Sequence, residues 1–248
     1  MKTLIIDIET SPNLAHVWSL WNQNVGLAQL RESTRVISFA AKWYGDKKVL
    51  FYSDHHDGHE AMIERAHVLL DEADAIVHFN GKSFDMKHLK REFAEAGMLP
   101  PSPWRDIDLL LAVKKQFRFP SNKLQYVSTA LGLEGKVQHS GHDLWVRCLA
   151  GDEKAWAVMR KYNKQDVVLT EKLYDRLLPW IDAHPHRGLF TDGETPVCGN
   201  CGSDQLQRRG YAVTLMSTYP RYQCQKCGRW SRGQSRSKAV DVRPVAGN

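Results

Sequence analysis

The chain has 248 residues, of which 42% are hydrophobic and 25% charged, and it carries a formal net charge of +6. This composition excludes a disordered or collagen-like chain and predicts one α/β domain with a small appendage. No apolar run approaches the roughly 18 residues of a membrane helix, so we expect no membrane partner. Asp7 and Glu9 lie where a signal peptide would be apolar, which indicates a cytoplasmic protein.

The N-terminal part of the chain predicts a meander of three strands. Residues 3–8 are almost uninterruptedly apolar, which is typical of a central strand. Residues 35–44 and 48–53 predict two more strands, joined by a turn at Gly45-Asp46. Apolar residues at helical spacing then predict a helix over about 59–72.

The middle of the chain alternates strands and helices. Residues 75–80 predict a fourth strand, and 104–107 a short fifth. Ser83 is expected to cap a helix that ends near Ala96, before Gly97. Three further helices are expected, the first of them capped by Ser121 or Asn122, over 121–131, 144–149 and 152–178. This order predicts an α/β fold with a mixed β-sheet flanked by helices.

Charge and composition divide the chain into four regions. We expect a folded domain over 1–180, a linker over 181–197, a cysteine-rich module over 198–234, and a basic, disordered tail over 235–248. From residue 198 onward nine Lys/Arg face two Asp, a balance of 9 − 2 = +7, whereas the rest of the chain sums to −1. Aromatic residues lie among these positive charges, which favours nucleic acid as the partner over a merely solubilising tail.

Two carboxylates stand at the end of the first predicted strand. Asp7 and Glu9 are two residues apart, so they point to the same face of the sheet. Side by side on a buried strand, they would cost several kcal/mol in lost hydration and repulsion unless a cation binds them. The alternative is a solvated strand end at which they cap a neighbouring helix.

Two more acids lie in the predicted helices. Asp166 interrupts an apolar stripe on the last helix, one turn after Tyr162. A core-edge arginine or Tyr162 itself could be its partner. Asp85 lies near the start of a helix, where the helix dipole alone favours an acid. Together the four carboxylates offer hard oxygen ligands, which bind Mg²⁺ or Mn²⁺.

Three segments resemble the exonuclease motifs of the DEDD superfamily. They are D-I-E-T at 7–10, F-N-G-K-S-F-D at 79–85 and Y-N-K-Q-D at 162–166. The tyrosine four residues before the last aspartate is similar to the DEDDy branch, which includes the proofreading domains of family B DNA polymerases. Histidine would mark the DEDDh branch, and none occurs between His142 and Asp166. The similarity covers roughly residues 1–180 and resembles a stand-alone phage exonuclease, which would act in the host cytoplasm.

The resemblance implies an RNase H-like fold and a two-metal-ion 3′–5′ exonuclease acting on single-stranded or frayed DNA or RNA. Asp7, Glu9 and Asp166 would hold one Mg²⁺ or Mn²⁺ ion. Asp7 would also share a second ion, with Asp85 acting mainly through water, and Tyr162 would orient the attacking water. Further residues are expected at the substrate: Thr10 and Asn80 by their motif positions, and Lys123, Tyr222 and Trp230 as phosphate or base contacts.

The four cysteines near the C-terminus form two CxxC pairs. Cys198-x₂-Cys201 and Cys224-x₂-Cys227 are each followed by glycine and resemble a zinc ribbon. This spacing predicts one structural Zn²⁺ and disfavours free thiols or disulfides in a cytosolic chain. The module could contact nucleic acid or a protein partner.

Other features have simpler interpretations. The run Asp54–Glu60 contains three histidines that could bind a transition metal, although a solvated loop is the usual role of such a segment. Core or cleft-wall positions are expected for four tryptophans, one of which could stack on a base: Trp18, Trp21, Trp145 and Trp156. Two rival functions remain: an RNase H-like endonuclease or structure-specific nuclease with the same acids, and a non-catalytic nucleic-acid-binding or adaptor protein.

Overall fold

The computed structural model describes residues 1–133, 140–193 and 195–243. The chain forms two compact units, one spanning Lys2–Tyr174 and the other beginning at Asp175. None of the helices in these described ranges is long and apolar enough to cross a bilayer.

A five-stranded mixed sheet forms the centre of the first unit, in the order β5-β4-β1-β6-β7. The β4 strand pairs antiparallel with both β1 and β5, whereas β6 pairs parallel with both β1 and β7. The strands are β1 (Thr3–Thr10), β4 (Val36–Trp43), β5 (Leu50–Ser53), β6 (Ala75–His78) and β7 (Arg105–Asp108). The mixed α/β fold expected from the sequence is therefore confirmed.

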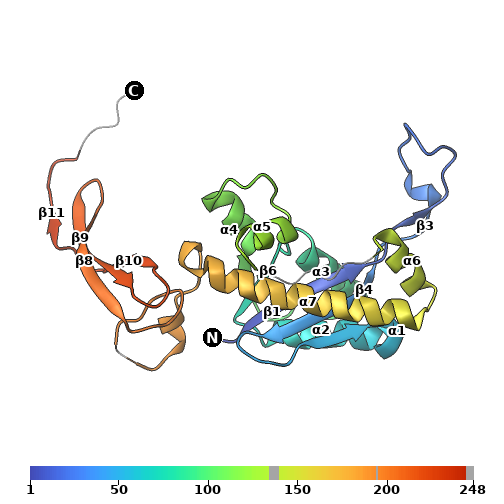
Figure 1. Cartoon of the computed structure of the whole chain (residues 1–248), viewed down its shortest axis with the longest axis horizontal. Helices are drawn as coiled ribbons and strands as arrows, with labels where there is room; N and C mark the ends of the chain where they lie inside the picture. Colours follow the sequence, from blue (N-terminus) through green and yellow to red (C-terminus); the bar gives the residue numbers. More distant parts are fainter. Residues whose placement is uncertain (134–139, 194, 244–248) are drawn as a thin grey trace. The chain divides into compact units, whose positions relative to one another are not determined.

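Helices cover both faces of this sheet, because its strands are apolar on both sides (Figure 1). Leu4, Ile6 and Ile8 of β1 pack with α2 and α3, whereas Ile37 of β4 packs with α6 and α7 on the opposite face. The helices are α1 (Asp54–Asp57), α2 (His59–Asp71), α3 (Asp85–Glu95), α4 (Leu109–Gln116), α5 (Leu124–Ala130), α6 (His142–Leu149) and α7 (Glu153–Leu177). Alternation along β1 then directs Asp7 and Glu9 to the face that α7 covers.

Several local expectations differ from the structure. The N-cap of α3 is Phe84 rather than Ser83, because the segment after Asn80 forms a tight turn in which the Phe84 N–H donates to the Asn80 carbonyl. The N-cap of α5 is Lys123, not Ser121 or Asn122. The expected helix and strand boundaries elsewhere lie within a few residues of those observed.

A small arm follows β1 in the sequence. It consists of β2 (Leu14–Ala15), a 3₁₀ turn η1 (Leu27–Gln29) and β3 (Leu30–Glu32), with β2 and β3 pairing antiparallel. Trp18 and Trp21 lie between the two strands and are 97% and 80% exposed. Of the four tryptophans expected in the core or a cleft wall, Trp156 is buried at 1% exposed, whereas Trp18 and Trp21 are not part of the core.

The second unit is built on a small antiparallel sheet. The β9 strand is central and pairs with β8, β10 and β11. The strands are β8 (Leu206–Val213), β9 (Ser217–Cys224), β10 (Trp230–Arg232) and β11 (Lys238–Ala239), and two 3₁₀ turns precede them, η2 (Leu178–Trp180) and η3 (Arg187–Phe190). β11 lies in the segment expected to be disordered, where it pairs with Ser217 and Thr218; the expected tail's residues 244–248 lie outside the described ranges.

Buried polar contacts hold this unit together. The Asn200 side chain is 6% exposed and donates to the carbonyls of Leu178 and Ile181, at 2.6 and 3.0 Å. Arg229 donates to the Pro179 carbonyl and pairs with Asp182, at 3.0 and 3.1 Å. Residues 178–182, at the start of this unit, therefore pack directly on the cysteine-rich module.

Candidate active site

The end of β1 carries Asp7 and Glu9 to an open edge of the sheet. β1 pairs with β6 only over Thr3–Ile5, whereas its pairing with β4 continues to Thr10. The two carboxylates therefore lie beyond the last residue paired with the parallel neighbour. In open α/β sheets this carboxyl end of a strand is where ligands bind.

The start of α3 brings Asp85 to the same place. Its carboxylate is 5% exposed and accepts a hydrogen bond of 3.1 Å from the backbone N–H of Ile8, between Asp7 and Glu9. The turn before α3 is anchored as well, because the Asn80 N–H donates to the Asp108 carboxylate at 3.0 Å. Asp85 is thus held against the backbone of the strand that carries the other two acids.

The α7 helix supplies the remaining groups. Asp166 is 6% exposed and lies on the buried stripe of this helix, as expected from its spacing. The hydroxyl of Tyr162 hydrogen-bonds to Asp166. Asn163 is fully buried, and its amide donates to Asp7 twice, to the backbone carbonyl at 3.1 Å and to Oδ2 at 2.7 Å. These bonds tie α7 to β1.

The sequence reasoning did not identify Asn163 as a site residue. Its position in the helix could have identified it, because Asn163 shares the buried face of α7 with Asp166 and with Thr170, which is 2% exposed. Polar side chains one helical turn apart on an apolar face need partners. That pattern alone predicts a polar contact with the sheet.

The pKa of Asp7 reflects its burial and the acidic side chains around it. Burial raises the pKa of its carboxyl well above the usual range, and the charges of Glu9, Asp85 and Asp166 raise it further. The hydrogen bond from Asn163 acts in the opposite direction. Three other carboxylates therefore lie close enough to Asp7 to disfavour its ionisation, an effect that a bound cation would reverse.

The pKa values of two neighbouring groups, Asp85 and Tyr162, are also raised. Burial raises the pKa of Asp85 to about 6, despite the lowering effects of His78 and of the Ile8 N–H. Burial also raises the pKa of Tyr162 far above its ordinary value, with the charges of Glu9 and Asp166 adding to the shift. Tyr162 is therefore a neutral phenol at physiological pH.

The donor set fits divalent cations that prefer oxygen ligands. Carboxylate oxygens suit Mg²⁺ and Mn²⁺ better than zinc. In the described ranges, the groups whose three or more ligand atoms all lie within 4.8 Å of one another are the four cysteines and a His55–His56–Glu153 cluster, so the four acids are spread more widely. Oxygens bound to one such ion at about 2.0–2.1 Å lie at most about 4.2 Å apart, so binding would draw the carboxylates closer together.

Comparison with known proteins identifies the family. The sequence profile of the RNase H superfamily matches residues 24–178, which is more than half of the chain. The chain belongs to the RNase H superfamily. The matched range contains Asp85, Tyr162 and Asp166, whereas Asp7 and Glu9 precede it. Comparison with curated protein sequences found no match.

Solved structures agree with this RNase H-like fold. The chain is similar to the family B DNA polymerase from the hyperthermophilic archaeon Pyrobaculum calidifontis, with a TM-score of 0.56 and 16% sequence identity. The match covers 90% of this chain and 33% of the polymerase chain, so this RNase H-like protein spans about a third of that length. At this identity the likeness concerns the fold.

The expected substrate residues of this RNase H-like chain lie near element ends. Thr10 is half-buried at a β-bulge next to Glu9. Asn80 is exposed and has a positive φ of 71°, which asparagine tolerates better than most residues. Lys123 is exposed at the N-cap of α5. Contact of these three residues with a substrate stays a prediction.

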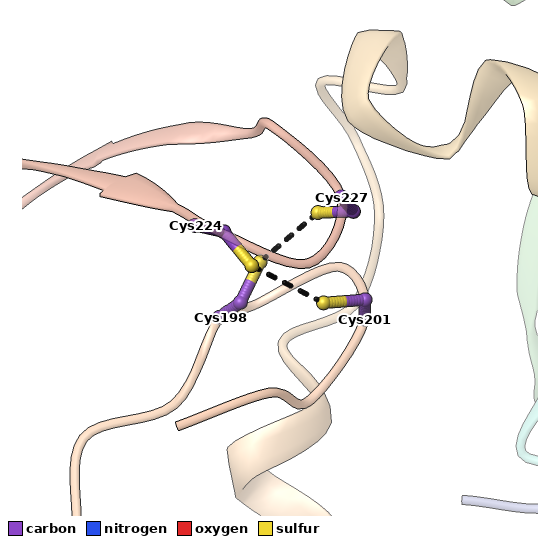
Figure 2. Close-up of side chains that lie close together, drawn as sticks. All are labelled: Cys198, Cys201, Cys224 and Cys227. Atoms are coloured by element: carbon purple, nitrogen blue, oxygen red, sulfur yellow. Dashed lines mark hydrogen bonds between the residues drawn. The ribbon is translucent and has the colours of Figure 1, made fainter. Parts of the chain in front are cut away.

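The four cysteines converge at one point of the second unit (Figure 2). The Sγ atoms of Cys198 and Cys227 are 3.6 Å apart, those of Cys201 and Cys224 are 3.5 Å apart, and all four lie within 4.8 Å of one another. Sulfurs bound tetrahedrally to zinc at about 2.3 Å would be roughly 3.8 Å apart. The arrangement is therefore compatible with a zinc ribbon.

Backbone donors favour a thiolate within this cluster. Burial opposes ionisation of Cys224, but N–H groups of Cys227 and Lys226 outweigh it and lower the pKa of Cys224 to about 7. Burial raises the pKa of Cys227 and of Cys201. A dication would favour the thiolate form of all four.

Proposed function

We propose that the protein is a metal-dependent 3′–5′ exonuclease that hydrolyses single-stranded or frayed nucleic acid, with DNA favoured. The observation that supports it most directly is the convergence of acids from β1, α3 and α7 on Asp7, with Tyr162 hydrogen-bonded to one of them. Membership of the RNase H superfamily supports a nuclease. The tyrosine four residues before Asp166 supports the DEDDy type.

In this proposal Asp7, Glu9 and Asp166 would hold one Mg²⁺ or Mn²⁺, and Asp7 would share the second, with Asp85 acting mainly through water. Such ions lower the pKa of a bound water and stabilise the departing 3′ oxygen. Asp85 is positioned for its part by the Ile8 N–H, and Asp7 by the amide of Asn163. The protein thus supplies carboxylates of fixed orientation rather than a strong base.

Tyr162 has the role of orienting the attacking water. Its raised pKa keeps the hydroxyl protonated, and that proton is directed to Asp166. The lone pairs of the phenol oxygen remain available to accept a hydrogen bond from water. A fixed acceptor on one side of the nucleophile restricts its line of attack on phosphorus.

The second unit is proposed to hold one structural Zn²⁺ through Cys198, Cys201, Cys224 and Cys227 and to bind the substrate strand. Its exposed face combines charge and aromatic rings: the Arg221 guanidinium lies 4.7 Å from the centre of the Trp230 ring, and Arg232 lies 4.2 Å from that of Tyr219. Tyr222 is half-buried and pairs with Ser231, on the opposite face of β9 from Arg221, because successive side chains of a strand alternate. Such surfaces bind single strands by phosphate contacts and base stacking.

End-labelled linear and circular single strands of DNA and RNA, incubated with Mg²⁺ or Mn²⁺, test the proposal. An exonuclease releases mononucleotides from linear strands and leaves the circle intact. Cleavage of the circle would indicate an endonuclease, and no cleavage of any substrate would indicate a non-catalytic binding protein. Asp166→Asn should abolish hydrolysis, whereas Asp46→Asn, in an exposed turn, is the matched control.

A further inference from the structure

A cluster of two histidines and a glutamate lies on the first unit, in a part of the chain that the proposed function does not use. His55 and His56 belong to the short helix α1, and Glu153 is the first residue of α7 (Figure 1). The Nε2 atom of His55 lies 2.8 Å from Oε1 of Glu153, and Nε2 of His56 lies 3.6 Å from Oε2. One ligand atom from each residue lies within 4.8 Å of the other two.

We propose that His55, His56 and Glu153 bind a transition-metal ion of the zinc type. Ligands at about 2.0–2.2 Å in a tetrahedral zinc site are roughly 3.3 Å apart. The two imidazoles lie at 2.8 and 3.6 Å from the two different oxygens of Glu153, so both already face the carboxylate at close to this spacing. Two imidazoles and one carboxylate favour zinc over magnesium. A water molecule would complete the tetrahedron, as in other sites with three protein ligands.

Neighbouring side chains hold both imidazoles in place. The His55 ring stacks on Trp156 with a centroid distance of 5.3 Å and an interplanar angle of 7°. Trp156 is 1% exposed, and its Nε1 donates to the Cys148 carbonyl at 2.9 Å, so the platform is rigid. The ring of His56 meets the same indole edge-on, at 82°.

A second contact orients the ring of His56. Its Nδ1 lies 2.8 Å from the hydroxyl of Ser53, which is fully buried. When Nδ1–H donates to this oxygen, the lone pair is on Nε2, the atom that points to Glu153. Metal-binding histidines are generally oriented by such a bond from the other ring nitrogen.

A simpler role for the cluster is a pair of exposed ion pairs. The side chain of Glu153 is 74% exposed, and exposed ion pairs contribute little to stability. That role requires neither the stacking of His55 nor the hydrogen bond to Ser53. A bound ion would use both, and it would link α1 to the first turn of the helix that carries Tyr162 and Asp166.

Calorimetric titration of the full-length protein with Zn²⁺ in excess Mg²⁺ tests the site. The wild type should bind one equivalent of zinc at this site, and so should the control His16→Ala, which removes an exposed imidazole elsewhere in the unit. In His55→Ala and in Glu153→Gln this equivalent should be absent or bound at least about tenfold more weakly. Ser53→Ala should weaken it by about 10- to 100-fold. Glu153→Gln alters an exposed side chain and should preserve the fold.

Thermal unfolding supplies a second readout. Zinc should raise the Tm of the wild type and of His16→Ala more than that of Glu153→Gln, because an ion that binds the native state stabilises it. Identical zinc binding and identical Tm shifts in wild type, His55→Ala and Glu153→Gln would overturn the proposal. The test compares the zinc bound by the wild type with the zinc bound by Glu153→Gln, so its result depends neither on the cysteine cluster nor on nuclease activity.

Discussion

Replacing Asp85 by asparagine should stabilise the metal-free protein while abolishing catalysis. The pKa of this carboxyl is raised from about 3.8 to about 6, chiefly by burial. Because the folded state binds the proton more tightly than the unfolded state, ionisation opposes folding. The stability that the protonated acid provides is present below about pH 4 and is lost as the pH rises through 6.

The size of the effect follows from the shift. About two pKa units correspond to roughly 3 kcal/mol of stability lost once the pH exceeds 7. About half of that loss has already occurred at pH 5, so roughly 1 kcal/mol separates pH 5 from pH 7. Asparagine keeps an oxygen that can accept the Ile8 N–H but carries no charge. Asp85→Asn should therefore be more stable than the wild type at pH 7, by up to about 3 kcal/mol.

Urea unfolding of both proteins at pH 5 and pH 7, in buffer without added divalent ions, measures this difference. The double difference between proteins and pH values cancels any effect of pH on the cysteine cluster. Saturating Mg²⁺ should stabilise the wild type at pH 7 and have a smaller effect on Asp85→Asn. If the variant is less stable at pH 7 and its pH dependence equals that of the wild type, Asp85 is not a buried acid of raised pKa.

Three further variants test other parts of the first unit. Tyr162→Phe removes one positioning hydroxyl, so the rate on a short single strand should fall about 10- to 1000-fold while metal affinity is kept; an unchanged rate would make Tyr162 a packing residue. Gly81→Ala places a methyl group 2.5 Å from Cγ of the fully buried His78, so urea unfolding should show a loss of about 1–3 kcal/mol, and an unperturbed protein would contradict this packing. Trp18→Ala with Trp21→Ala should weaken binding of a single strand by about 1–3 kcal/mol per stacked base, measured by fluorescence anisotropy, whereas equal affinity would exclude the arm from the substrate path.

The sequence predicted those site residues that are acidic within otherwise apolar segments. Asp7 and Glu9 end an apolar strand, and Asp166 interrupts an apolar stripe, so the residue pattern alone indicates a polar centre at each of these positions. Asn163 lies one helical turn from Asp166 on the same face, a pattern that predicts a polar partner but does not say which one. Its two bonds to Asp7 depend on how α7 lies against β1, which is a property of tertiary packing.

Contacts between residues far apart in the sequence could not be predicted from the sequence. The run from Asp54 to Glu60 showed histidines that could bind a metal, but the carboxylate that meets them is Glu153, on another helix. Trp18 and Trp21 are a second example. Large aromatic side chains are usually well buried, but both of these are exposed in the structure. Helix caps also depended on local geometry, as the turn after Asn80 moved the start of α3 past Ser83.

The basic face of the ribbon tests whether the second unit binds the substrate. Arg221 and Arg232 are opposite each other on β9 and β10, and each lies over an aromatic ring. If both contact phosphates, Arg221→Gln with Arg232→Gln should reduce the slope of log K against log salt by about 1.4 for a 30-mer single strand. The control is Arg65→Gln, which removes an exposed charge from α2 in the other unit.

Binding measured from low to moderate salt separates the explanations. Loss of affinity with a flatter slope indicates phosphate contacts, and a residual affinity that persists at high salt indicates stacking on Tyr222 or Trp230. The double variant keeps all four cysteines, so its zinc content should not change. Equal slopes in the variant and the wild type would mean that this face does not touch nucleic acid, and the aromatic and arginine side chains that it exposes would then favour a protein partner, because these residue types are enriched at protein–protein interfaces.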